Sequence, residues 1–203
     1  MGKINNKKMQ MKKVVVFCGS GAGHSEVFRN GAHQLGAYLA SQQIDLVYGG
    51  AQVGLMGAVA DGVLSKGGKV TGVIPDFLAA KEIRHHHLTE MIVVKSMHER
   101  KLLMSELCDG VIALPGGFGT LDELFEMLTW AQLGLHQKPI ALYNIDGYFN
   151  DLIQFIDKVN ANGFISTIHR AMLIVDDNVE SLLTKMTNYQ APPIPSWLNR
   201  SDV

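Results

Sequence analysis

The sequence lacks the features that would point to a membrane protein, a secreted protein or a nucleic-acid-binding protein. Its 203 residues carry a formal net charge of only -1, so no basic surface for nucleic acid or an anionic membrane is expected. No apolar run approaches the length of a membrane span, and none of signal-peptide length follows the basic first dozen residues. Its two cysteines, Cys18 and Cys108, belong to no CxxC pair or zinc-type spacing. These absences predict a cytoplasmic protein with a small-molecule partner, no nucleic-acid or membrane partner, and no metal.

Size and composition predict a single folded unit. A chain of this length, with 47% hydrophobic and 18% charged residues, suffices for one well-buried α/β domain. We expect a disordered basic leader over residues 1–12, one domain over residues 13–190, and an extended C-terminal arm over residues 191–203. The arm is expected to lack helix because it contains Pro192, Pro193 and Pro195.

Apolar runs alternate with amphipathic patterns along the predicted domain. The runs predict strands at residues 13–18, 44–48, 70–74, 91–94, 111–114, 139–143 and 172–175. The amphipathic patterns predict helices at residues 25–41, 55–66, 97–107, 121–133, 148–160 and 179–186. Because the strands are continuously apolar, we expect a parallel sheet covered on both faces. The predicted fold class is α/β, a Rossmann-like, doubly wound, mainly parallel sheet of about seven strands with helices on both faces.

Glycine-rich turns follow three of these strands, at residues 19–23, 49–57 and 115–119. Ligands bind beyond the carboxyl ends of the strands in this architecture, so the three turns are expected to line one site. The segment 75–90 has no strong periodicity and is expected to be an active-site flap. A nicotinamide enzyme is disfavoured, because His24 occupies the sixth place of the glycine fingerprint and the second strand ends in Tyr48-Gly49-Gly50 without an acid.

The most informative stretch is Pro-Gly-Gly-Phe-Gly-Thr-Leu-Asp-Glu at residues 115–123, between an expected strand and an expected helix. Glycines allow close approach of a ligand to the backbone, and the start of a helix favours an anion such as phosphate. Glu123 adds a carboxylate that a phosphate cradle does not need, which indicates chemistry on whatever the phosphate carries. The alternative is a capping box, in which Thr120 and Glu123 only satisfy N–H groups at the helix start.

Arg100 is the second informative residue. It falls on the apolar stripe of its predicted helix with Leu103 and Met104, so it is expected to point inward. A buried guanidinium needs an anionic partner or a route to water. A phosphate or Glu123 would be available at the same edge of the sheet. The alternative is an arginine whose head group reaches solvent at the helix end.

Two polar groups near Arg100 in the sequence are expected to have structural roles. Ser96 and Glu99 are expected to form the capping box of the helix that carries Arg100. The consecutive residues His85, His86 and His87 cannot share one face of a helix or strand, and no set of ligands at metal-binding spacing accompanies them. We therefore expect a solvated loop there.

On these residues the chain resembles the LOG ("Lonely guy") family of cytokinin riboside 5'-monophosphate phosphoribohydrolases, often mislabelled as lysine decarboxylases. The resemblance covers about residues 13–190 and rests on the motifs at residues 48–50, 54–57, 97–101, 115–123 and 146–148. It implies hydrolysis of the N-glycosidic bond of an adenine-type nucleoside 5'-monophosphate, either a cytokinin riboside 5'-monophosphate or AMP. It also implies a homodimer and no cofactor. A non-catalytic nucleotide carrier or sensor on the same fold is the alternative.

The resemblance implies that Arg100 and Glu123 form the catalytic pair. Together with the glycine turns, it gives the expected substrate- and phosphate-binding residues: Gly19, Ser20, Gly49, Gly50, Glu82, Lys101, Gly116, Gly117, Phe118, Gly119, Thr120, Leu121, Asp122 and Thr129. Gly21 and Ala51 depart from the family's pattern, which leaves the contacts of their loops open. A true lysine decarboxylase is disfavoured, because these loops offer no lysine besides Lys101 for a Schiff base with pyridoxal phosphate.

Overall fold

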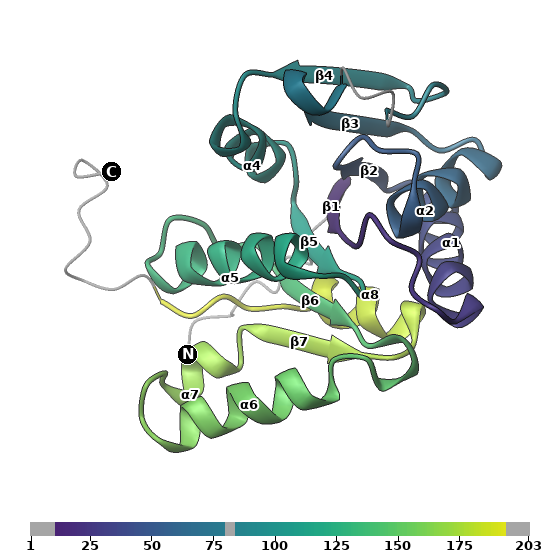
Figure 1. Cartoon of the computed structure of the whole chain (residues 1–203). Helices are drawn as coiled ribbons and strands as arrows, with labels where there is room; N and C mark the ends of the chain where they lie inside the picture. The colour runs from purple at the N-terminus through teal and green to yellow at the C-terminus, as the bar shows by residue number, and fades with distance from the viewer. Residues whose placement is uncertain (1–10, 80–83, 194–203) are drawn as a thin grey trace, which may run out of the picture.

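Seven parallel strands form the centre of the structure, a computed structural model that describes residues 11–79 and 84–193 (Figure 1). Their order across the sheet is β4-β3-β2-β1-β5-β6-β7, and every neighbouring pair is parallel. The strands are β1 (Lys13–Phe17), β2 (Asp45–Tyr48), β3 (Val70–Pro75), β4 (Glu90–Val94), β5 (Gly110–Ala113), β6 (Ile140–Tyr143) and β7 (Leu173–Asp176). The predicted doubly wound sheet is confirmed.

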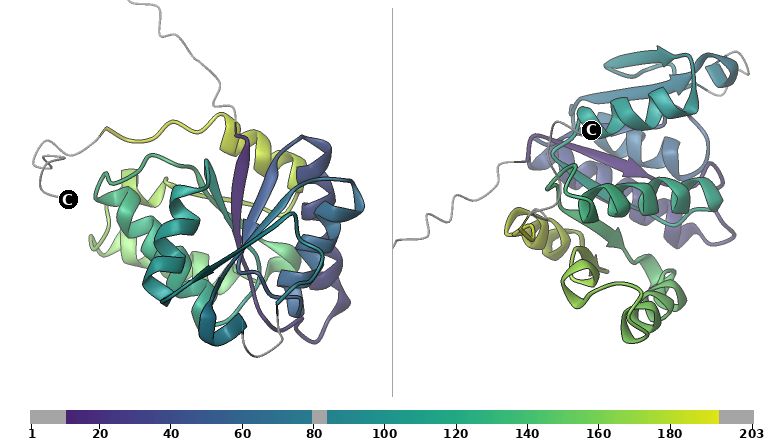
Figure 2. Two further views of the ribbon diagram at one scale, coloured as in Figure 1. Left: turned by 90° about the horizontal axis from the view of Figure 1, so that it is seen from above. Right: turned by 90° about the vertical axis from the view of Figure 1, so that its left-hand side faces the viewer.

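Helices cover both faces of this sheet (Figure 2). They are α1 (Glu26–Ser41), α2 (Gly54–Ser65), α3 (Asp76–Ala79), α4 (Met97–Glu106), α5 (Phe118–Gln132), the 3-10 turn η1 (Ile145–Gly147), α6 (Asn150–Ala161), α7 (Thr167–Arg170) and α8 (Val179–Thr187). Helices α1, α2 and α8 pack on one face, and α4, α5 and α6 on the other. Alternate residues of β1 serve the two cores: Val14 and Val16 face the first layer, whereas Val15 and Phe17 face the second.

The direction of strand addition reverses between β1 and β5. The chain adds β2, β3 and β4 on one side of β1 and then returns through α4 to β5 on the other side. Ligand sites of α/β proteins lie at such a switch point, outside the carboxyl ends of the strands. The two loops at this point are bonded together, since the Gly19 N–H donates to the Pro115 carbonyl at 3.0 Å.

The predicted flap contains more structure than expected. It holds the short helix α3, and Arg84 forms an isolated antiparallel bridge with Ala51. Glu82, expected to bind nucleotide, lies outside the described residues, as do residues 1–10 of the expected leader and residues 194–203 of the expected arm. The predicted domain limits at 13 and 190 stay predictions. None of the helices in the described ranges has both the length and the hydropathy that a membrane span requires.

Candidate active site

A cleft of about 380 Å³ opens at the carboxyl ends of β1, β2 and β5, on the switch point of the sheet. This volume lies within the usual range for small-molecule sites. Its apolar wall includes Met56, Ile74 and Met97. Of the residues predicted to act in the site, those that line the cleft are Gly19, Ser20, Gly49, Arg100, Gly117, Phe118, Gly119, Thr120 and Glu123.

Helix α5 starts three residues earlier than predicted. Its N-cap is Gly117, which offers no side chain for capping, and the helix runs from Phe118. Thr120 is therefore inside the first turn and Glu123 in the second, so the capping-box alternative is wrong. Both side chains are buried instead. The dipole of α5 and the first-turn N–H groups thus lie beside the cleft, as anion binding requires.

The glycines of this turn differ in their surroundings. A Cβ atom on Gly116 would lie 2.1 Å from Thr120 Oγ1 and 2.8 Å from the Gly19 nitrogen, so no larger residue fits there. Gly116 itself is not among the residues that line the cleft. Cβ atoms on Gly117 and Gly119 would meet nothing within 4 Å. The turn is thus tightly packed at Gly116, whereas Gly117 and Gly119, which line the cleft, have free space beside them.

Arg100 points inward from α4, as predicted, and only 8% of the residue is exposed. Its Nε donates to the Val73 carbonyl at 3.1 Å, which fixes the guanidinium against β3. A Cβ atom on Gly49 would lie 2.1 Å from Arg100 Nη2, so the guanidinium occupies the space that this glycine leaves. The predicted capping box supports the same helix: Ser96 Oγ accepts from the Glu99 N–H, although the Glu99 carboxylate accepts from Lys95 N rather than from Ser96.

Glu123 is the acid of the cleft, and 9% of it is exposed. Burial raises the pKa of its carboxyl to about 7, and the positive charge of Arg100 opposes this rise. In turn, burial lowers the pKa of Arg100, and the charge of Glu123 opposes that change. The two groups therefore reduce each other's cost of burial, and the carboxyl changes its charge close to neutral pH.

Lys101 and Asp122, both expected to contact nucleotide, are paired with each other instead of lining the cleft. The Lys101 ammonium lies 3.1 Å from Asp122 and 3.0 Å from Glu126, and these contacts join α4 to α5. Glu126 was not predicted from the sequence. Its position four residues after Asp122 on one helix face was the available signal.

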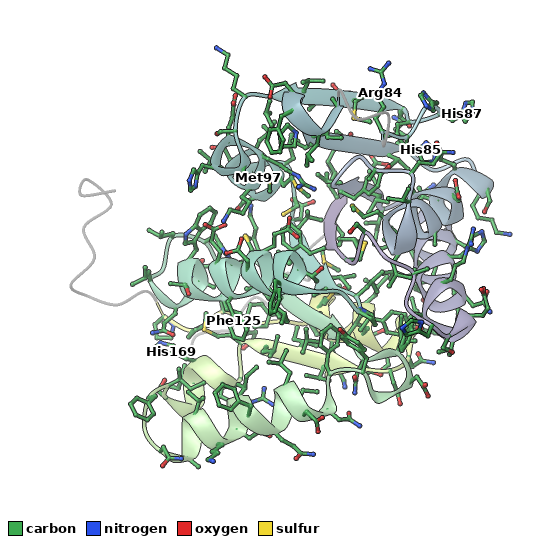
Figure 3. The ribbon with its side chains drawn as sticks, viewed as in Figure 1. Arg84, His85, His87, Met97, Phe125 and His169 are labelled. Carbon is green, nitrogen blue, oxygen red and sulfur yellow. The ribbon has the colours of Figure 1, made fainter. Side chains whose placement is uncertain are left out.

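The remaining predicted residues lie behind or away from the cleft. Gly50 has a positive φ of 78°, and its carbonyl accepts from the His85 N–H at 2.9 Å. Leu121 is half-buried on α5 outside the cleft lining. The Thr129 hydroxyl donates to the Phe125 carbonyl at 2.7 Å, and both residues line a second, apolar groove together with His169 (Phe125 and His169 are labelled in Figure 3). In a single chain, Thr129 is not part of the cleft.

The prediction of a solvated histidine loop is wrong for His85. This residue is buried, and its Nε2 lies 3.1 Å from the Asp61 carboxylate of α2, whereas His86 and His87 are exposed. Figure 3 places His85 beside Arg84 and His87, near β3. The partner of His85 could not be predicted from the sequence, because Asp61 lies 24 residues away on another element. No cluster of three or more His, Cys, Asp or Glu side chains suited to a metal occurs within residues 11–79 and 84–193.

The fold and the cleft define a Rossmann-like α/β protein with an anion-favouring ligand site that is lined by a buried arginine and a buried carboxylate. Comparison with known proteins identifies the family. Residues 56–186 match the family model described as "Possible lysine decarboxylase". The chain is 46% identical over 187 residues to the cytokinin riboside 5'-monophosphate phosphoribohydrolase LOG7 of Arabidopsis thaliana, covering 92% of this chain and 86% of LOG7. It is also 46% identical over 180 residues to the probable phosphoribohydrolase LOGL9 of Oryza sativa subsp. japonica, covering 89% and 79%. The chain belongs to the LOG family.

Solved structures confirm the fold. The molybdenum cofactor carrier protein of Chlamydomonas reinhardtii superimposes with a TM-score of 0.66 at 20% identity, covering 86% of this chain and 95% of the carrier. At an identity this low, the similarity shows that the two proteins share a fold and says nothing about the ligand of the present protein.

Proposed function

We propose that the protein hydrolyses the N-glycosidic bond of a cytokinin riboside 5'-monophosphate, or of AMP, and releases the free base and ribose 5-phosphate. The observation that carries this proposal is the burial of Arg100 and Glu123 in the cleft that the glycine turn lines. The names of the related plant proteins support the same reaction.

The start of α5 would hold the 5'-phosphate. Gly117, Gly119 and Thr120 line the cleft, and the two glycines leave the space beside the backbone open. Gly19 and Ser20 face them from the end of β1. A phosphate held between these loops accepts backbone N–H groups and lies at the positive end of the helix dipole. This contact fixes the ribose one helical turn away, against Glu123.

Glu123 would act on the sugar in its ionised form. The bond between C1' and the base nitrogen breaks with positive charge developing on the ribose, and a carboxylate beside the sugar stabilises that charge. The same carboxylate can orient the water whose oxygen joins C1', while the base leaves with a proton. Arg100 balances the charge of the carboxylate or of the phosphate. Removing one such electrostatic partner typically lowers turnover about 10²–10³-fold.

The rival function is a carrier or sensor that binds nucleotide without turnover. A binding module needs the glycine turns but gains nothing from an acid buried beside the ligand, since burying its charge is costly. We test this by incubating the protein with N6-isopentenyladenosine 5'-monophosphate and with AMP. Chromatography should show free base and ribose 5-phosphate. Tight binding of either nucleotide without base release would establish the rival and overturn the proposal.

We also propose that two copies of the chain form a homodimer. An apolar groove of about 190 Å³ lies between α5, α6 and α7 and contains Phe125, Thr129 and Phe155. Phe155 and Ile168 are each 60% exposed, and Phe164 is 82% exposed. Exposed apolar surface of this kind marks protein interfaces. Light scattering should give twice the chain mass for the wild type and a smaller mass for Phe155→Glu; a monomeric wild type would contradict the proposal.

We also propose that the protein is located in the cytoplasm. Cys18 and Cys108 are both buried and free, which suits a reducing compartment. Burial raises the pKa of both thiols, so they stay protonated and unreactive. Microscopy of the full chain with a C-terminal fluorescent tag checks this, and fluorescence confined to an organelle would contradict it.

A further inference from the structure

Tyr148 forms a direct contact with the glycine turn. Its hydroxyl donates to the Gly116 carbonyl at 2.7 Å. Gly116 immediately precedes Gly117, the N-cap of α5, so this bond acts at the point where the backbone turns into the helix. Tyr148 lies outside the residues that line the cleft, so it acts through the turn rather than on the ligand.

The loop that presents Tyr148 is itself held in place. Asp146 and Gly147 both have positive φ, 52° and 69°, a backbone shape that aspartate tolerates better than most residues. Ile145 packs against α1 where Gly31 leaves room, since a Cβ on Gly31 would lie 2.7 Å from Ile145 Cδ1. The Asn144 side chain accepts from the Phe149 N–H at 2.7 Å and closes the loop. Tyr148 therefore projects from a rigid support.

The ring of Tyr148 is also linked to the first glycine loop, through Phe28 of α1. It meets the Phe28 ring edge-on, with centroids 5.7 Å apart and an interplanar angle of 78°. Phe28 in turn packs against Gly23, where a Cβ would lie 3.0 Å from Phe28 Cδ2. One side chain thus contacts the loop after β5 directly and the loop after β1 through Phe28. These are the two loops that the Gly19 N–H to Pro115 carbonyl bond joins.

From these contacts we propose that Tyr148 is a positioning residue, which holds the Gly116 turn and the first glycine loop at the separation that a phosphate group requires. This inference rests on the proposed function, because it takes the 5'-phosphate as the group between the loops. The turn is closely packed on the side of Thr120 and Gly19, where a Cβ on Gly116 would lie 2.1 Å from Thr120 Oγ1 and 2.8 Å from the Gly19 nitrogen, so we expect loss of the carbonyl contact to displace the N-cap instead. The effect should therefore fall on phosphate binding and not on the rest of the nucleotide.

The test compares ligands that differ in the phosphate. We would measure binding of ribose 5-phosphate and of adenosine by calorimetry for the wild type, Tyr148→Phe and the control Tyr38→Phe. Tyr38 lies near the end of α1 away from the cleft. The loss of one hydrogen bond should weaken ribose 5-phosphate binding about 3- to 10-fold in Tyr148→Phe and leave adenosine binding unchanged. The control should match the wild type for both ligands.

A second variant removes the other contact. Phe28→Leu leaves the hydroxyl of Tyr148 in place but takes away its ring partner. It should give a smaller loss of ribose 5-phosphate binding and should also leave adenosine binding unchanged.

In Tyr148→Phe, the KM for nucleotide should rise more than kcat falls. Equal binding of ribose 5-phosphate by Tyr148→Phe and the wild type would overturn this inference, as would an equal loss for adenosine. A wild type that binds neither ribose 5-phosphate nor the nucleotide and releases no base would instead contradict the proposed function.

Discussion

Arg100 and Glu123 come from different helices and lie buried at the same cleft, the arginine over the end of β3 and the glutamate in the second turn of α5. Each makes the burial of the other less costly, because each opposes the pKa change that burial imposes on its partner. The result is a carboxyl with a pKa of about 7 in a cleft that also holds a cation.

Glu123→Gln should fold normally and gain relative stability as the pH rises. Because burial raises the carboxyl pKa from 4.5 to about 7, the stability that the protonated Glu123 contributes is complete below pH 4.5. It is lost as the pH rises through about 7. Glutamine has no charge to bury, so the melting temperature of the variant minus that of the wild type should increase across this range. Melting curves at several pH values check this, and a difference that shrinks with rising pH would contradict it.

The rate of hydrolysis should depend on the same carboxyl. Since the proposed mechanism needs ionised Glu123, kcat/KM should fall as the pH drops through about 7. The measurement is a profile of kcat/KM against pH from about 5.5 to about 8.5. A profile that stays flat to the acid end would show that the ionised form is not required.

Glu126→Gln should move this acid limb to lower pH. The charged groups that act on Glu123 are Arg100 and Lys101 on α4 and Asp122 and Glu126 on α5. Removing the negative charge of Glu126 makes ionisation of Glu123 easier, and Lys101 keeps Asp122 as a partner. Asp157→Asn is the matched control, because its carboxylate pairs with Arg170 away from the cleft. An acid limb displaced equally in both variants would argue against the local electrostatic effect.

Two glycines of one turn should respond in opposite ways to alanine. Gly116→Ala places a methyl group 2.1 Å from Thr120 Oγ1 and should lower the melting temperature strongly. Gly119→Ala meets nothing within 4 Å inside α5 and should stabilise the fold by about 0.5–1 kcal/mol, the usual gain for this exchange in a helix. Chemical denaturation of both variants tests this. Similar stability changes of the same sign would mean that the turn is not packed as described.

The fold was predictable because its signal is local. Continuous Val, Ile and Leu runs gave all seven strands to within a few residues, and the order of strands and helices gave the parallel sheet. Arg100 could be predicted to point inward from its place on a helical stripe, and the structure confirms it. The start of α5 was placed three residues too late because the amphipathic pattern begins at Leu121, whereas the helix begins at Phe118 and Thr120 packs against Gly116.

The contacts that the sequence did not reveal all join distant segments. His85 meets Asp61 across 24 residues, Tyr148 meets Gly116 across 32, and Lys101 meets Asp122 across 21. No periodicity encodes such pairs, because they depend on which loops and helices the sheet order brings together. Thr129 was predicted from the family resemblance alone, and its nucleotide contact stays a prediction.

The most direct test of the central claim is release of ribose 5-phosphate from N6-isopentenyladenosine 5'-monophosphate by the wild type and by Glu123→Gln, with nucleotide binding measured on the same samples. The wild type should release ribose 5-phosphate and free base. The variant should bind the nucleotide but turn it over at least about 10²-fold more slowly, because the ionised carboxylate is missing from the transition state. Turnover by the variant at the wild-type rate would contradict the catalytic role of Glu123.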